Sequence, residues 1–190
     1  MIGILDTQAG NLTSVRAALD RLGLAHRTLW DVETDGLDAI LVPGQGHFGS
    51  VMASLDARGW RDALLAWHGE NRRLVGICVG QQILFEGSDE APDAAGLGLL
   101  AGRAERLDFP KRPMVGWAPV EWTDPSLPAG DAYFVNSFAA RQSADALAQT
   151  TYGERFVSAV RRRNTVAVQF HPEKSGAWGQ QVLAQLLTSP

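Results

Sequence analysis

Short apolar runs alternate with amphipathic stretches along the first half of the chain. Four of the runs have the length of buried strands: residues 2–5, 26–30, 39–42 and 74–77. Apolar side chains at helical spacing predict helices over residues 13–22 and 60–68, and residues 81–85 begin a third helical pattern. Such alternation predicts a parallel sheet with helices on both faces.

The second half of the chain is richer in strands. Five apolar runs joined by short turns are predicted to be strands: residues 115–122, 132–138, 147–152, 156–160 and 166–170. Residues 177–187 are predicted to form an amphipathic helix with an apolar stripe. Because no repeat and no long linker interrupts this pattern, we expect residues 1–190 to form one α/β domain with a mixed, mostly parallel sheet.

Composition and charge argue for an ordinary globular protein. Apolar residues make up 45% of the chain and charged residues 20%, which is typical of soluble domains. The formal net charge is −4, whereas nucleic-acid-binding proteins usually present a basic surface. The run Arg161-Arg162-Arg163 is the local exception, and we interpret it as a solvated turn rather than a phosphate site.

The single cysteine, Cys78, excludes an intrachain disulfide and is typical of a reducing compartment. The first residues of the sequence have the pattern of a strand and not of a secretory signal. No apolar run approaches the ~18 residues needed to span a bilayer. We therefore expect a cytoplasmic protein that does not associate with a membrane.

The segment Gly76-Ile77-Cys78-Val79-Gly80 joins a predicted buried strand to the start of a helix. It is the thiol counterpart of the Gly-x-Ser-x-Gly nucleophile elbow, which places a nucleophile at the tip of a strand. Its glycines allow a sharp turn, and a helix N-terminus beside the sulfur favours the reactive thiolate. Alone, the motif would fit a buried structural cysteine equally well. However, the end of a central strand is where open α/β sheets place their sites.

A thiol nucleophile needs a base, and the base needs a group that orients it. His171 follows the end of the predicted strand at 166–170, and Glu173 lies two residues later, with Pro172 fixing the backbone between them. His171 would take the thiol proton and pass it to the leaving group, while Glu173 would hold the imidazole tautomer. The other histidines are interpreted as structural or exposed: His26, His47 and His68.

The loop Pro43-Gly44-Gln45-Gly46 follows the predicted strand at 39–42. Acyl transfer needs hydrogen-bond donors aimed at the developing oxyanion, and a glycine-rich loop can present backbone N–H groups there. Taken alone, the loop is better explained as an ordinary turn at a strand end. It is not a phosphate loop, because no Gly-Lys-Ser/Thr follows. The cysteine and the histidines show no metal-ligand spacing, and we expect no cofactor.

Three blocks of the sequence, in this order, resemble the class I (triad) glutamine amidotransferases: residues 43–46, 76–80 and 169–173. The resemblance extends over nearly the whole chain and implies the flavodoxin-like amidotransferase fold. It also implies that Cys78, His171 and Glu173 form the catalytic triad. Cys78 would attack the side-chain amide of glutamine and form a γ-glutamyl thioester, so that ammonia and then glutamate are released.

The same resemblance implies roles for residues around the nucleophile. Gln82 matches a position that contacts glutamine, and Glu90 matches an acidic residue that holds the α-amino group of the substrate. Backbone groups of Gly46, Ser137 and Phe138 would help to bind the substrate. The oxyanion loop would comprise three residues: Gly44, Gln45 and Gly46.

Further segments are similar to the branch of this family that serves histidine biosynthesis: residues 4–6, 11–15, 116–117, 133–138 and 171–176. This branch implies a heterodimer with a cyclase subunit, a (β/α)₈ barrel that receives the ammonia and activates the glutaminase allosterically. The whole complex would act as a lyase. Asn11, Trp117 and Lys174 match positions that face this partner.

The chain departs from the commonest family pattern beside the site, at Gln45, at Gln81 (where Met is usual) and at Asn136. None of these departures removes the triad, but they leave the details of oxyanion formation and allosteric activation open. Three alternatives remain: an amidotransferase that serves another synthase, a non-catalytic partner-binding module, and a cysteine hydrolase that acts on peptides. The intact triad argues against the module, and Gln82 and Glu90 argue against the hydrolase.

Overall fold

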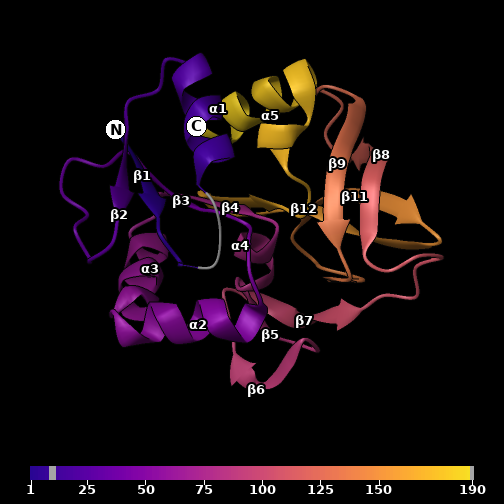
Figure 1. Ribbon diagram of the computed structural model, residues 1–190, viewed down its shortest axis with the longest axis horizontal. Helices are drawn as coiled ribbons and strands as arrows, with labels where there is room; N and C mark the ends of the chain where they lie inside the picture. The colour runs from indigo at the N-terminus through magenta and orange to yellow at the C-terminus, as the bar shows by residue number, and fades with distance from the viewer. Residues whose placement is uncertain (9–11, 189–190) are drawn as a thin grey trace.

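A computed structural model describes residues 1–8 and 12–188 of the chain. Within this part of the chain the main sheet has nine strands, in the order β2-β1-β3-β4-β13-β12-β11-β8-β9 (Figure 1). Five neighbouring strands run parallel: β1 (Ile2–Leu5), β2 (His26–Leu29), β3 (Ala39–Val42), β4 (Arg73–Ile77) and β13 (Thr165–Val168). Most of them are covered on both faces, which explains their continuous apolar runs. The predicted parallel sheet is confirmed.

The other strands extend the sheet in antiparallel fashion: β12 (Glu154–Arg162), β11 (Ala146–Tyr152), β8 (Met114–Trp122) and β9 (Gly130–Asn136). Along β8, buried and more exposed positions alternate, as in a sheet with one face open to solvent. The sheet is therefore mixed, as the pattern of the second half predicts.

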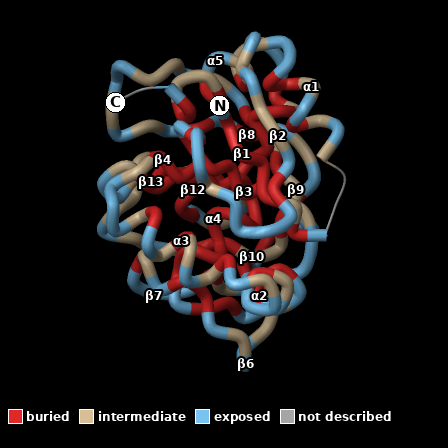
Figure 2. Tube along the Cα trace, turned by 90° about the vertical axis from the view of Figure 1, so that its left-hand side faces the viewer, coloured by how far each residue is buried: buried red, intermediate tan, exposed pale blue. Residues whose placement is uncertain are grey.

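Helices cover both faces of the main sheet. α1 (Thr13–Arg21) and α5 (Gly176–Thr188) lie on one face, and α2 (Phe48–Ala57) and α3 (Trp60–Gly69) lie on the other (Figure 1). Each pair encloses an apolar core of its own, so that buried residues fill the interior between helices and sheet (Figure 2). No helix in the described residues is long and apolar enough to cross a membrane.

A second, four-stranded sheet lies beneath α2, and the sequence pattern does not predict it. Its strands in spatial order are β10 (Phe138–Ala139), β7 (Leu100–Arg106), β5 (Phe85–Ser88) and β6 (Ala91–Ala95). The helix expected over residues 81–85 is wrong, because α4 spans only Val79–Gln82 and Phe85 already begins β5. Residues 83–85 are all buried, so their apolar run could not distinguish helix from strand.

Helix α2 is also missing from the sequence prediction. Its N-terminus is capped twice: the His47 ring accepts a hydrogen bond from the Gly49 amide (3.2 Å), and Glu90 Oε2 accepts one from the Phe48 amide (2.7 Å). The second cap comes from 42 residues away in the sequence. A local pattern cannot reveal such a partner, although the buried positions of this helix do have helical spacing.

Three predicted boundaries are displaced. The strand expected over residues 132–138 is divided at Ser137, which separates β9 from β10 in the other sheet. The strand expected over residues 166–170 ends at Val168. In the basic run, Arg161 and Arg162 still belong to β12, and the exposed turn begins at Arg163 with φ +56°.

Candidate active site

Cys78 lies at a sharp turn between β4 and α4. Its backbone angles, φ +51° and ψ −107°, are unusual for a residue with a side chain. The neighbouring glycines are required by packing: a Cβ on Gly76 would lie 2.4 Å from the Gly80 carbonyl oxygen, and a Cβ on Gly80 would lie 2.3 Å from the Val42 carbonyl oxygen. The local geometry is therefore that of the predicted nucleophile elbow.

His171 and Glu173 follow β13, which is the direct parallel neighbour of β4. The His171 Nδ1 atom lies 2.8 Å from Glu173 Oε1, and both side chains are at least 97% buried. The backbone of His171 is held on both sides, since its amide donates to the Tyr133 carbonyl (2.9 Å) and its carbonyl accepts from Ser175 Oγ (2.7 Å). The predicted base and its predicted orienting carboxylate thus follow the strand next to the one that carries Cys78.

Charge on the imidazole is favoured despite its burial. Desolvation alone would lower the pKa of His171, but the charge and hydrogen bond of Cys78, together with the hydrogen bond and charge of Glu173, raise this pKa to about 10. The imidazole is consequently protonated at neutral pH and pairs with the sulfur on one side and the carboxylate on the other. A protonated imidazole beside a cysteine favours the nucleophilic thiolate.

A cavity of about 190 Å³ opens at Cys78. Six residues that were singled out from the sequence line it: Gly46, Cys78, Gln82, Glu90, Ser137 and Phe138. They come from four separate segments of the chain, and the fold brings them together near the carboxyl ends of β3 and β4. Val79, Val135 and Asn136 complete much of the wall. Such a concave, partly apolar space with convergent polar groups is typical of a small-molecule site.

Buried amides connect the cavity wall to the nucleophile. Gln82 Nε2 donates to the Phe138 carbonyl (2.8 Å) and to Gln169 Oε1 (3.1 Å), and Gln169 Nε2 lies 3.5 Å from Cys78 Sγ. Asn136 Nδ2 donates to the same Phe138 carbonyl (3.2 Å). No role for Gln169 was predicted from the sequence, because a lone glutamine at the end of an apolar run carries no chemical pattern. Its position two residues before His171 was the one available signal.

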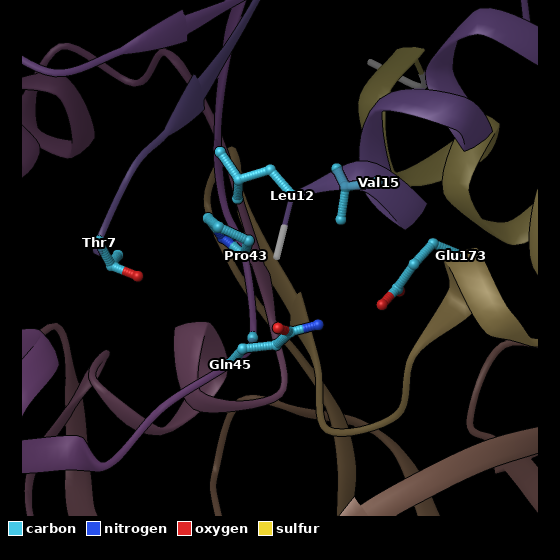
Figure 3. Close-up of a pocket in the computed structure, with 7 residues that line it drawn as sticks. Thr7, Leu12, Val15, Pro43, Gln45 and Glu173 are labelled. Atoms are coloured by element: carbon cyan, nitrogen blue, oxygen red, sulfur yellow. The ribbon is translucent and has the colours of Figure 1, made fainter. Parts of the chain in front are cut away.

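The predicted oxyanion loop packs directly against the elbow. A Cβ on Gly44 would lie 2.1 Å from the Ile77 carbonyl oxygen and 2.4 Å from Cys78 Cβ, so only glycine allows this approach. Gly46 has a positive φ of 111°. A second, small cavity of about 10 Å³ lies beside this loop, and Gln45 and Glu173 point into it in Figure 3.

Two of the three residues expected to face a partner, Trp117 and Lys174, belong to the described part of the chain. Trp117 on β8 is 56% exposed and Val115 on the same strand is 58% exposed. The Trp117 ring contacts the Tyr133 ring on β9 edge to face, with the centroids 5.9 Å apart. Lys174 lies in the short 3₁₀ helix η1 (Pro172–Lys174), directly after the triad. Asn11 lies outside the described residues.

Within the residues that are described, no cluster of His, Cys, Asp and Glu could hold a metal ion.

Solved structures of known proteins share this fold. A crystal structure of a glutamine amidotransferase matches with a TM-score of 0.81 and 24% sequence identity, covering 98% of both chains. PurLQS from Thermotoga maritima matches with a TM-score of 0.78 and 16% identity, covering 98% of this chain and 96% of the other. This fold, with a cysteine elbow beside a buried His–Glu pair, defines a class I glutamine amidotransferase.

Curated relatives narrow the class to one family, although no protein-family model matches the chain. The imidazole glycerol phosphate synthase subunit HisH of Synechococcus sp. (strain CC9605) is 43% identical, over 98% of this chain and 93% of the relative. The subunit HisH of Deinococcus radiodurans is 41% identical, over 95% of this chain and 90% of the relative. The chain belongs to the family of imidazole glycerol phosphate synthase subunits HisH.

Proposed function

We propose that this chain is the glutaminase subunit of an imidazole glycerol phosphate synthase in histidine biosynthesis, with Cys78, His171 and Glu173 as its catalytic triad. The observation that carries the proposal is that these residues follow two adjacent parallel strands, at the point where a cavity of about 190 Å³ opens at Cys78. The Cys78 sulfur and the His171–Glu173 pair, joined at 2.8 Å, lie at the ends of adjacent strands. All 190 residues would form one amidotransferase domain in the cytoplasm.

The first half of the reaction releases ammonia. The Cys78 thiolate attacks the side-chain carbonyl carbon of glutamine, and the carbonyl electrons move onto oxygen to give a tetrahedral oxyanion. This oxyanion would be held by the Val79 amide and by amides of the loop 44–46. The carbon–nitrogen bond then breaks as protonated His171 gives its proton to the departing nitrogen. The products are ammonia and a γ-glutamyl thioester on Cys78.

The second half releases glutamate. The now neutral His171 takes a proton from water, and the hydroxide attacks the thioester carbonyl. When the carbon–sulfur bond breaks, the electron pair returns to Cys78, which regains its thiolate form beside the imidazolium. Glu173 keeps Nδ1 of the imidazole engaged throughout, so that Nε2 faces the reacting atoms.

The cavity wall supplies candidate groups for the rest of the substrate. Glu90 lines the cavity, and although one of its oxygens caps α2, a carboxylate can accept further hydrogen bonds. It would hold the α-amino group of glutamine. Gln82 and the backbone of Gly46, Ser137 and Phe138 would contact the remainder.

The ammonia would pass to the other subunit of the synthase, a cyclase with a (β/α)₈ barrel. Exposed apolar side chains on β8, at Val115 and Trp117, support a protein partner on this face. A relative from Arabidopsis thaliana, named imidazole glycerol phosphate synthase hisHF, supports it further. This chain is 37% identical to the relative and covers 34% of its length, which leaves ample chain for a second subunit.

The proposal is tested by measuring glutamate formation from glutamine, with and without the cyclase subunit and its ligand. We expect the chain alone to be nearly inactive and the complex to be stimulated at least ~10-fold, a coupling of about 1–3 kcal/mol or more. Cys78→Ala should abolish hydrolysis in the complex yet still bind the cyclase. Full activity of Cys78→Ala would rule out the nucleophile, and a lack of stimulation would rule out this partner.

A further inference from the structure

Gln169 is a buried side chain that the proposed mechanism does not yet use. It is 1% exposed and belongs to the segment between β13 and His171. Its amide reaches the Cys78 sulfur on one side (3.5 Å) and the amide of Gln82 on the other (3.1 Å). One residue therefore touches both the nucleophile and a wall of the substrate cavity.

The orientation of this amide follows from its neighbours. The Phe138 carbonyl can only accept a hydrogen bond, so Gln82 must turn its NH₂ group toward it. The same NH₂ group faces Gln169, which must therefore present its carbonyl oxygen to Gln82. The NH₂ group of Gln169 is then left facing the sulfur. The order of donors and acceptors is thus fixed by a backbone carbonyl that cannot reverse its role.

We infer that Gln169 is a positioning residue with two effects: it donates a hydrogen bond to the Cys78 thiolate, and it fixes the Gln82 amide in the cavity wall. This inference rests on the proposed function of the same site. A donor beside sulfur stabilises the thiolate relative to the thiol, since the thiolate is the stronger acceptor. Holding Gln82 aligns the substrate before attack, which lowers the cost of reaching a reactive geometry.

Charged side chains near Cys78 also influence whether its sulfur is a thiol or a thiolate. His171, supported by Glu173, faces Cys78 from the strand beside it, and Glu90 faces the cavity from the other side. In the described part of the chain, neither His171 nor Glu90 is hydrogen-bonded to the Gln169 side chain, so a change at position 169 removes no partner of theirs. A difference between variants at position 169 therefore reports the amide and not the imidazole.

The test compares the reactivity of the single thiol in matched variants. Iodoacetamide alkylation of the full chain, followed by intact mass across pH, reports Cys78 alone because the chain has no second cysteine. Gln169→Met keeps a side chain of similar length but removes donor and acceptor. We expect alkylation near pH 7 to slow roughly tenfold, as for loss of a hydrogen bond to a charged group, and its pH profile to move to higher pH.

Gln81→Met is the matched control. Gln81 is also 1% exposed and lies three residues after the nucleophile, but neither atom of its amide has a hydrogen-bond partner among the described residues. The same substitution therefore replaces a buried amide by an apolar side chain near the site, but it leaves the contact between Gln169 and the Cys78 sulfur intact. We expect this control to keep the wild-type alkylation rate and pH profile. Equal slowing in both variants would reduce the effect to core packing and overturn the inference.

A second variant separates the two effects of Gln169. In Gln169→Glu an oxygen can still accept from Gln82, but an ionised carboxylate offers no donor to the sulfur. In the complex with the cyclase, we expect Gln169→Met to raise KM for glutamine and lower kcat, whereas Gln169→Glu should chiefly lower kcat. Wild-type kinetics and alkylation in both variants would overturn the inference. If the wild-type complex showed no glutaminase activity, the proposed function would be refuted. The alkylation data would still decide whether Gln169 donates a hydrogen bond to the sulfur.

Discussion

Cys78 occupies a conformation that costs energy in the folded chain. A residue with a side chain at φ +51° is strained by about 1–3 kcal/mol relative to an ordinary conformation. The surroundings maintain it, since the Cys78 amide donates to the Val168 carbonyl (2.7 Å) and Gly44 packs against its Cβ. This turn places Cys78 at the wall of the cavity, where the proposed reaction requires it.

The protonation of His171 depends on its neighbour in a measurable way. Since the charge and hydrogen bond of Cys78 are the largest influences that raise the pKa of His171 to about 10, removing the sulfur must lower that pKa. We expect an NMR titration of the His171 ring to show a protonated imidazole through pH 9 in the wild type. In Cys78→Ala the midpoint should fall toward neutral pH. An unchanged midpoint would mean that Glu173 alone holds the proton.

The three residues proposed as the triad could be singled out from the sequence because each comes shortly after a strand that can be recognised locally. An elbow motif, a His–x–Glu pair and a glycine loop mark the ends of three buried strands, and adjacent strands bring their ends together. The cavity wall was not predictable from residue patterns alone. Gln82, Glu90 and Phe138 were proposed through family resemblance, and Gln169 gave no pattern, because its partners are 87 and 91 residues away in the sequence.

At the scale of elements, the main sheet was predictable and the small sheet was not. The strands of the first have apolar runs bounded by turns, whereas β6 contains Pro92 and no strongly apolar side chain. β10 has only two residues. Such strands are defined by the pairing of distant segments and not by local propensity. Helix α4 was misplaced for a related reason, since its four residues are held by the elbow and not by helical periodicity.

The elbow is an element whose glycines can be tested individually. Gly80→Ala places a Cβ 2.3 Å from the Val42 carbonyl, so β3 or α4 must shift, and we expect a loss of about 2–3 kcal/mol in the free energy of unfolding. Gly69→Ala is the control, because the added Cβ meets no described atom within 4 Å. It should gain about 0.5–1 kcal/mol. Urea unfolding measures both, and a tolerated Gly80→Ala would contradict the packing argument.

At the scale of the molecule, the β8–β9 ribbon has two different faces. Its inner face belongs to the core, through Ala118 and Phe134. Its outer face carries Val115 and Trp117, which pair across the ribbon with Val135 and Tyr133. Val135 also lines the substrate cavity, and its carbonyl lies 3.8 Å from the Cys78 sulfur. A partner bound to the outer face would therefore be one strand away from the nucleophile.

Removing the Trp117 side chain should weaken the complex and spare the fold. The residue is 56% exposed, so we expect Trp117→Ala to change the free energy of unfolding by less than about 0.5 kcal/mol. Binding to the cyclase should weaken roughly 30-fold or more, as for a tryptophan hot spot. Trp30→Ala is the control, since Trp30 is 47% exposed but follows the edge strand β2 at the far end of the sheet. The affinities are measured by calorimetric titration. If both variants bound the cyclase with equal affinity, the interface would lie elsewhere.

The position of β13 determines when the proposed site can form during translation. This strand is synthesised after all the others, yet it lies in the middle of the sheet, between β4 and β12. A nascent chain thus carries its thiol for some 90 residues of synthesis before the imidazole arrives. Until β13 enters the gap, the sulfur has no proton donor beside it. With the proposed triad, a nascent chain that still lacks β13 and His171 is expected not to hydrolyse glutamine.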